Sequence, residues 1–144
     1  MRTILLIMIG ISSLMASNFS RNANGVVTDS RTNLEWQDDY SDNTNSIKAT
    51  TWKSAIEYCE NLNLDSNNDW RLPNLNELTS LVYNRAYNPA IDDLFQKTNA
   101  DYYWSSTTNV NNNISAWVVS FNNGRHNNYD KSLNNSVRCV RAGQ

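Results

Sequence analysis

Few residues in this 144-residue chain carry side chains suited to covalent or metal chemistry. There is one histidine, His126, and there are two cysteines, Cys59 and Cys139. Zinc sites need several histidine or cysteine ligands at short spacing, which argues against zinc here. A hydrolytic triad needs a base, and the single histidine lies in an asparagine-rich stretch. We therefore expect no catalysis, no metal and no cofactor; an enzyme that uses two carboxylates is the less favoured alternative.

Asp65, Asn67 and Asp69 have the alternating oxygen ligands with which a calcium-binding loop begins. Such a loop needs a glycine at its sharp turn and a glutamate that closes the site. Trp70 stands at the glycine position here, and Asn76 stands at the glutamate position. We therefore expect a turn that leads into Trp70 rather than a calcium site.

The first residues have the pattern of an export signal. Arg2 precedes an apolar run over residues 4–11, and small residues over positions 12–17 are typical of cleavage after Ala16 or Ser17. An uncleaved membrane anchor is the alternative, although the run is shorter than the ~20 residues that a spanning helix needs. We expect a periplasmic, secreted or cell-surface protein. Its expected parts are a signal peptide (1–17), a flexible leader (18–24) and a single domain (25–144).

Export also bears on the two cysteines, because disulfides form in oxidising compartments. If Cys59 and Cys139 pair, they close a loop of about 80 residues. The chain-entropy model makes such a loop worth ~4 kcal/mol of stability. Two free thiols or a metal site are the alternatives that the residues themselves leave open.

The charge balance is mildly acidic, with a formal net charge of −2. Removal of Arg2 with the signal peptide changes the charge by −1, to −3, which argues against a general polyanion or nucleic-acid binder. Arg125, Lys131, Arg138 and Arg141 make the C-terminal part locally basic. An ordinary solvated surface is the simpler interpretation, and a weakly basic face is the alternative.

The stretch from Asp69 to Leu78 is expected to end a strand and begin a helix. Pro73 favours an extended conformation at the residue before it. Asn74 is suited to cap the helix, and Glu77 three residues later completes a capping box. Leucines at helical spacing predict a helix over residues 74–84. The residues that we assign to this scaffold are Trp70, Arg71, Pro73, Asn74, Glu77 and Trp104.

Periodicity predicts the other elements. Apolar residues at helical spacing predict a helix over 51–64 with Cys59 on its buried face. The expected strands are 25–29, 34–37, 102–108, 116–121, 125–131 and 136–141, with a polar loop at 38–49 and an irregular connection at 87–95. This order predicts an α+β domain, with two helices before a meandering antiparallel sheet.

Four motifs in chain order carry a family resemblance: Thr51-Trp52 through Tyr58-Cys59, Asp69-Trp70-Arg71-Leu72-Pro73-Asn74 with Glu77-Leu78, Tyr103-Trp104-Ser105-Ser106, and Val137-Arg138-Cys139-Val140-Arg141. From about Gly25 to Arg141 the chain resembles the family named for the C-terminal domain of the Legionella collagen-like adhesin. The resemblance implies a C-type-lectin-like fold, in which two helices flank a twisted antiparallel sheet, and it implies that Cys59 pairs with Cys139.

The adhesin that names this family binds sulfated glycosaminoglycans. Its collagen-like repeat does not occur in this sequence, and the chain is acidic, so both features argue against that ligand. Calcium-dependent lectins of the implied fold use Glu-Pro-Asn or Gln-Pro-Asp with Trp-Asn-Asp, and these triplets do not occur either. The related formylglycine-generating enzymes need an active cysteine pair, whereas the resemblance assigns both cysteines to one structural bridge.

Asparagine is concentrated between Asn109 and Asn135. Genome base composition is one explanation. The other is a retroelement-diversified variable region, which the segment resembles in its residue types and C-terminal place. Asparagine and tyrosine side chains suit recognition. The predicted ligand contacts are Asn111, Asn112, Asn113, Asn122, Asn123, Arg125, His126, Asn127, Asn128, Tyr129, Lys131, Asn134 and Asn135.

We therefore predict a secreted or surface-displayed binding or adhesion module without catalysis. Its partner would be a protein or glycan at a cell surface, and not a nucleic acid. An envelope-associated structural domain with no specific ligand is the alternative. The tryptophans could form a sugar-stacking platform, but their positions on apolar faces favour a core role; they are Trp36, Trp52, Trp70, Trp104 and Trp117.

Overall fold

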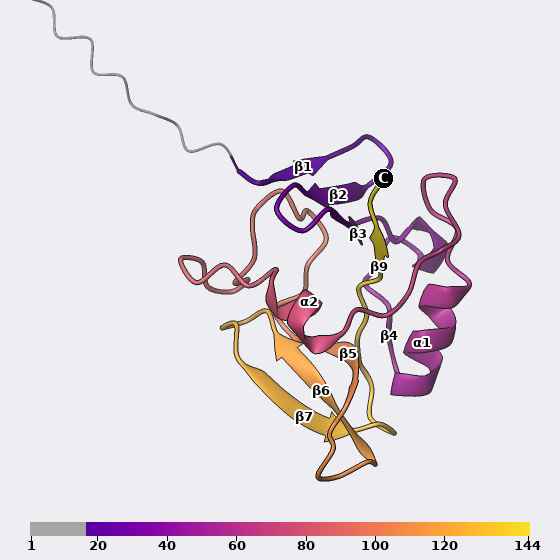
Figure 1. Cartoon of the computed structure of the whole chain (residues 1–144), viewed down its shortest axis with the longest axis vertical. Coiled ribbons are helices and arrows are strands. Elements are labelled where there is room, and N and C mark those ends of the chain that lie inside the picture. Colours follow the sequence, from indigo (N-terminus) through magenta and orange to yellow (C-terminus); the bar gives the residue numbers. More distant parts are fainter. Residues whose placement is uncertain (1–16) are drawn as a thin grey trace, which may run out of the picture.

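The computed structural model describes residues 17–144, so all but the last residue of the predicted signal peptide lies outside the described residues. Figure 1 shows two β-sheets with two helices packed beside them. The elements in chain order are β1 (Phe19–Arg21), β2 (Val26–Asp29), β3 (Leu34–Gln37), the 3-10 turn η1 (Ser41–Asn43), β4 (Ala49–Thr50), α1 (Trp52–Glu60), α2 (Leu75–Thr79), β5 (Tyr102–Thr108), β6 (Ser115–Ser120), β7 (His126–Asp130), β8 (Asn135–Ser136) and β9 (Val140–Ala142). The predicted α+β class is confirmed.

The first sheet has the strand order β1-β2-β3-β9, and each neighbouring pair is antiparallel. Its edge strand β1 lies within residues 18–24, where we expected a flexible leader. That expectation is wrong, because Phe19–Arg21 pair with Val27–Asp29 of β2. The Phe19 ring also packs edge-to-face on Phe95, with ring centroids 5.5 Å apart.

The second sheet has the order β4-β8-β5-β6-β7, with β7 at its edge. Strands β5, β6 and β7 form the expected antiparallel meander, whereas β5 and β8 pair in parallel. The expectation of one antiparallel sheet is therefore wrong. The predicted strand 136–141 is divided, because β8 joins this sheet and β9 joins the first, with Val137–Cys139 between them.

Both faces of the second sheet carry buried residues, and successive residues of a strand point to opposite faces. Neighbours such as Trp104 and Tyr103, or Val118 and Val119, therefore enter different cores. The α1 core consists of Val26, Ala55, Cys59, Leu62, Trp70, Leu72, Trp104, Ala116, Val118, Val137 and Cys139. The α2 core consists of Val27, Trp36, Leu78, Leu81, Ile91, Phe95, Tyr103, Val119, Phe121 and Val140.

The capping box at α2 is confirmed. The Asn74 side chain accepts a hydrogen bond from the Glu77 N–H at 2.9 Å, and the Glu77 carboxylate accepts one from the Asn74 N–H at 2.9 Å. The helix is shorter than the predicted 74–84, because it ends at Thr79 and the Ser80 hydroxyl donates to the Glu77 carbonyl at 2.6 Å. Beyond it, Val82 bridges to Ile91.

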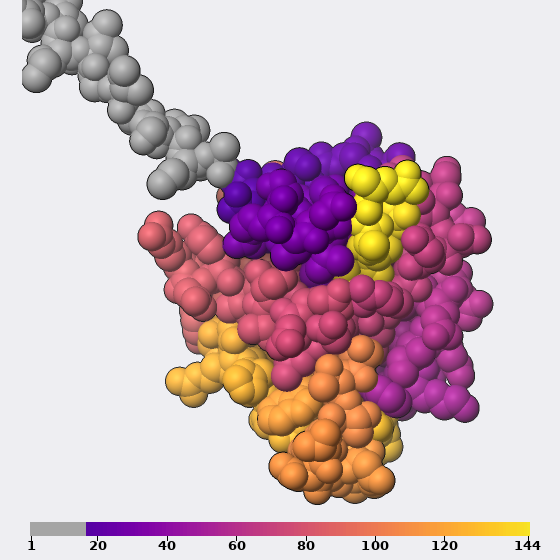
Figure 2. Space-filling view, in the orientation of Figure 1, coloured from indigo at the N-terminus to yellow at the C-terminus, as the bar shows by residue number. Residues whose placement is uncertain are grey.

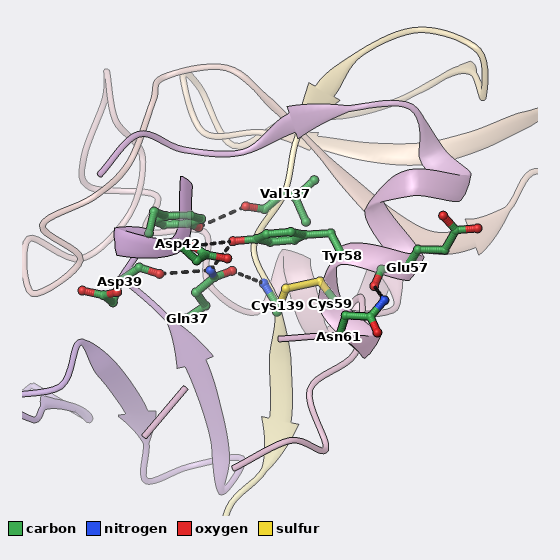
Figure 3. The surroundings of a disulfide bond; sticks show 10 residues. Gln37, Asp39, Asp42, Glu57, Tyr58, Cys59, Asn61, Val137 and Cys139 are labelled. Atoms are coloured by element: carbon green, nitrogen blue, oxygen red, sulfur yellow. Dashed lines mark hydrogen bonds between the residues drawn. A yellow bond between two sulfur atoms is a disulfide. The ribbon is translucent and has the colours of Figure 1, made fainter. Parts of the chain in front are cut away.

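The Cys59–Cys139 disulfide is confirmed and joins α1 to the segment between β8 and β9 (Figure 3). The Gln37 side chain supports it, since its amide nitrogen donates to the Tyr58 hydroxyl at 2.8 Å and its oxygen accepts from the Cys139 N–H at 3.2 Å. Burial raises the pKa of Tyr58 above its ordinary value, so this hydroxyl stays neutral. Hydrogen bonds of Gln37 therefore hold both sides of the disulfide in place.

A fully buried ion pair between Asp38 and Arg138 lies next to the disulfide. The Arg138 guanidinium donates to Asp38 at 3.3 Å, to the Gln37 carbonyl at 3.0 Å and to the Thr98 hydroxyl at 2.8 Å. Asp38 accepts a further bond from Arg21 at 3.0 Å. The pair therefore connects β1, the end of β3, the loop before β5 and the C-terminal segment, and the same bonds turn the chain between β8 and β9.

Arg141 of β9 makes a second set of ion pairs. Its guanidinium donates to Asp69 at 2.6 Å and also to Glu35. It lies 6.0 Å from the centre of the Trp70 ring. These bonds fix the strand end before Pro73 against the first sheet.

Candidate functional site

The structure divides the predicted contact residues among three places on the second sheet. Strands β5, β6 and β7 are antiparallel and joined consecutively, so the β5–β6 loop and the β6–β7 turn lie at opposite ends of β6. A six-residue strand separates these ends by roughly 20 Å. The asparagine-rich loops therefore do not form one patch, because strand direction places them at opposite ends of β6.

We call one end the tip, which consists of residues 109–114 and 131–134. Asn111, Asn112, Asn113 and Asn134 are exposed there. Asn135 is not free for contact, because it lies in β8 opposite Thr50 and its amide nitrogen is buried. The tip also presents Val110, Ile114 and Leu133, which are exposed by 93%, 60% and 50%.

Lys131 stabilises the tip. Its ammonium donates to the Thr108 hydroxyl at 2.9 Å and to the Asn113 carbonyl at 3.0 Å. It also lies 4.1 Å from the centre of the Trp52 ring, a cation–π distance. Its donors are thus largely used inside the protein, and we reassign Lys131 from ligand contact to loop support.

The opposite end holds Asn122, Asn123 and Arg125 in the β6–β7 turn. The Asn123 side chain accepts a bond from the Arg125 N–H at 3.1 Å, which fixes the turn. Gly124 has φ +76°, and a Cβ there would lie 2.5 Å from Val82 Cγ1. Glycine therefore lets this turn pack closely against the segment that follows α2.

The segment 83–88 lies beside this turn and was missed as a contact region by sequence reasoning. The Asn88 N–H donates to the Asn122 carbonyl at 2.9 Å, so the two loops are bonded to each other. Tyr83 and Tyr87 are exposed by 45% and 72%. We call residues 83–88 and 122–125 together the turn surface; both loops project to the left in Figure 2. The mixture of Tyr, Asn and Arg in residues 83–88 was the signal that could have found it.

Strand β7 separates its predicted contacts by face. Asn127 and Tyr129 lie opposite Val118 and Ala116, on the side of the α1 core. Tyr129 packs edge-to-face on Tyr102, with centroids 4.9 Å apart. Tyr129 is therefore partly a core residue rather than a free contact.

His126 and Asn128 lie on the other face of β7, opposite Val119 and Trp117. The His126 ring packs edge-to-face on Trp117, with centroids 5.6 Å apart. Sequence reasoning placed Trp117 in the core with the other tryptophans. Trp117 is instead half-buried and belongs to neither core.

The alternative of a weakly basic C-terminal face is wrong. Arg138 is fully buried with Asp38, Arg141 pairs with Asp69 and Glu35, and Lys131 supports the tip. Arg125 and Lys131 have no ion pair within residues 17–144, and Lys131 uses its donors on Thr108 and Asn113. These bases serve mainly to hold the fold.

The acidic residues are also mostly engaged. Asp65 accepts bonds from the Asn22 and Asn24 amides at 2.8 and 2.5 Å, and the Arg141 guanidinium lowers the pKa of Asp69. No group of three or more His, Cys, Asp and Glu side chains in the described part of the chain is arranged to hold a metal ion. A hollow of about 660 Å³ runs along α1 beside Lys48 and Tyr58.

Within residues 17–144, none of the helices has the length and apolar character needed to cross a membrane. Comparison with curated proteins finds no match. The family model of the Lcl C-terminal domain matches residues 25–141, from β2 into β9, and so includes the disulfide, the capping box and both ends of the second sheet. With most of its length matched, and with the motifs of the resemblance in their expected structural roles, the chain belongs to the Lcl C-terminal domain family.

Proposed function

We propose that this protein is an exported binding or adhesion module without catalysis, whose ligand contacts the turn surface. Family membership suggests a surface or adhesion-related role, which supports this proposal. The C-type-lectin-like fold that the resemblance implies is part of the proposal. The ligand class is a protein or glycan at a cell surface.

One observation carries the proposal. The exposed tyrosines of the described chain, Tyr83 and Tyr87, lie on a loop bonded to the β6–β7 turn. Arg85 and Arg125 on these two loops have no carboxylate partner within residues 17–144. Exposed tyrosine, arginine and asparagine side chains are the composition that antibody paratopes use for contact.

The order of these two loops favours ligand binding. The β6–β7 turn is fixed by its own side-chain bond and by Gly124, and the loop 83–88 bonds to it. Contact residues on loops that are already ordered lose less conformational entropy when a ligand binds. The buried ion pair and the disulfide hold the C-terminal segment that joins the two sheets.

Binding of the fluorescently labelled mature protein to cell surfaces and to a glycan and protein array tests the proposal. The variant Arg85→Ala/Tyr87→Ala should lose binding with an unchanged melting temperature, because neither side chain belongs to a core. The matched control is Val110→Ser/Ile114→Ser, which changes two exposed side chains at the opposite end of β6. Loss of binding in the control alone would transfer the site to the tip. No binding by the parent protein would favour the structural domain without a ligand.

A further inference from the structure

Trp117 differs from the other four tryptophans in its surroundings. Trp36 belongs to the α2 core, Trp70 and Trp104 belong to the α1 core, and Trp52 packs against the α1 core. Trp117 is in neither core and does not pack against either. This half-buried tryptophan in the middle of a strand therefore contributes little to the hydrophobic cores.

The indole N–H groups show the same difference. Trp52, Trp70 and Trp104 donate to backbone carbonyls at 2.9–3.3 Å. The Trp36 N–H is buried without a partner. The Trp117 N–H has no acceptor in the described part of the chain and is not among the buried unpaired atoms, so it reaches the surface. Tryptophan N–H groups usually find a partner, which makes this group available to a ligand.

Two polar side chains adjoin this indole. Asn128 lies directly opposite Trp117 on β7, and His126 packs on its ring at 5.6 Å. Within residues 17–144 neither side chain makes a hydrogen bond, and neither is a buried unpaired group. An aromatic ring, an indole donor, an imidazole and an amide therefore lie together on one face of the edge hairpin.

Leucines of α2 and of the segment after it cover only part of this sheet face. Leu78 and Leu81 cover Val119 and Phe121, which lie on the same side of β6 as Trp117. Strand β7 is the edge of the sheet, so no further strand flanks His126 and Asn128. The three side chains lie next to the turn surface, because Arg125 immediately precedes His126.

We infer that Trp117, His126 and Asn128 form a binding site for a neutral saccharide. The apolar C–H face of a pyranose would stack on the indole ring, and its hydroxyls would bond to the indole N–H, the imidazole and the amide, which both donates and accepts. This inference rests on the proposed function. It names a ligand class for the surface that lies beside the turn surface.

The charge at the Asn128 end of the site favours a neutral ligand over an anionic one. Asp130 lies on the same face of β7 as Asn128, two residues further along. The backbone N–H and the hydroxyl of Ser132 lower the pKa of Asp130, so its carboxylate is charged at neutral pH. A sulfate or uronate placed beside Asn128 would therefore meet a negative charge.

Titration of the indole N–H resonances by NMR tests the inference, with Trp117→Phe used to assign the Trp117 signal. The probes are the methyl glycosides of glucose, galactose, mannose and N-acetylglucosamine, with glucuronate and glucose 6-sulfate as anionic counterparts. At least one neutral probe should shift the Trp117 signal saturably and leave the other four indole signals in place. The anionic counterparts should bind more weakly. Absence of any shift at high millimolar concentration, or stronger binding of the anionic probes, overturns the inference.

Asn128→Ala should weaken the neutral probe by about tenfold, and Asn127→Ala is the matched control because it changes the neighbouring asparagine on the opposite face. Equal losses in both variants would contradict the site. The array experiment with the Arg85→Ala/Tyr87→Ala variant is independent of these titrations. If monosaccharides leave Trp117 unchanged while that variant still loses array binding, the saccharide site fails and the proposed function stands. If both fail, neither is supported.

Discussion

The β6–β7 hairpin and the C-terminal segment 136–142 follow one another in the chain and are both rich in polar residues, but their polar groups have opposite surroundings. In the C-terminal segment, Arg138 and Arg141 are buried with carboxylate partners, and Cys139 is bridged to α1. In the hairpin, the side chains of His126 and Asn128 make no hydrogen bond within residues 17–144. We call residues 136–142, with the carboxylates and the cysteine that they bind, the frame. We call the open side of the β6–β7 hairpin the face.

This difference separates stability from binding. Buried charges need partners, because an unpaired charge in the interior is costly. Exposed amides and rings cost little when they are left free in water, so they can be kept for a ligand. Changes in the frame should therefore lower stability first, and changes in the face should lower binding without unfolding the domain.

The largest effect is expected from removal of the disulfide. Cys59→Ser/Cys139→Ser opens a loop with a sequence separation of 80 residues. The free energy of unfolding should fall by about 4 kcal/mol, because the unfolded chain gains conformational entropy. Chemical denaturation of the oxidised parent and the double variant measures this difference. A loss below about 1 kcal/mol would mean that the bridge contributes little to the frame.

The buried ion pair should have the next largest effect. Arg138→Met leaves the Asp38 carboxylate buried without its main cationic partner and should cost about 3 kcal/mol of stability. Arg138→Met/Asp38→Asn should recover part of that loss, because it removes the unpaired charge. Denaturation of the two single variants and the double variant gives the coupling energy. Additive losses would show that the two side chains act independently.

Neighbouring residues of β7 point to opposite faces, so their replacement should lower stability by unequal amounts. Tyr129→Ala should cost about 2 kcal/mol, because Tyr129 packs on Tyr102 and the α1 core. Asn128→Ala, one residue earlier and on the open face, should change stability by less than about 0.5 kcal/mol. Thermal melts of both variants compare the two faces directly. Equal losses would mean that both side chains contribute to the core.

Sequence patterns predicted the local features of this molecule well. The capping box of Asn74 and Glu77 and the strands β5 to β7 depend on residues close together in the chain, and the structure contains them. The Cys59–Cys139 pairing came from the family resemblance and is present. The division of the last strand between two sheets was not predictable, because it depends on Arg138 meeting Asp38 about 100 residues away.

The candidate site was predicted only in part, for a related reason. The asparagine-rich composition indicated a recognition region, but composition does not say which end of β6 each loop occupies. The partner loop 83–88 joins the turn through a backbone bond from Asn88 to Asn122, which leaves no pattern in the sequence. Trp117 shares a sheet face with the buried Val119 and Phe121, so alternation predicted a core role, but it lies beside the edge strand β7 and is only half-buried.

Acid should slightly lower the free energy of unfolding through protonation of Glu77. Arg71, whose guanidinium donates to Glu77 at 2.7 Å, lowers the pKa of that carboxylate, and the Asn74 N–H adds to the effect. Since the folded pKa lies below the unfolded value, this stabilisation is complete above the unfolded pKa and is lost as the pH falls through the folded pKa.

The expected size is at most about 1 kcal/mol, because Arg71 is half-exposed and water screens the pair. The difference in unfolding free energy between the parent and Glu77→Gln should therefore shrink between about pH 5 and pH 3. Denaturation curves at several pH values measure it, with Glu57→Gln as the control because its pair with Lys53 is exposed and long at 3.9 Å. A constant difference for Glu77 across this range would mean that the capping box works through its neutral hydrogen bonds alone, and that the stability of α2 does not depend on charge.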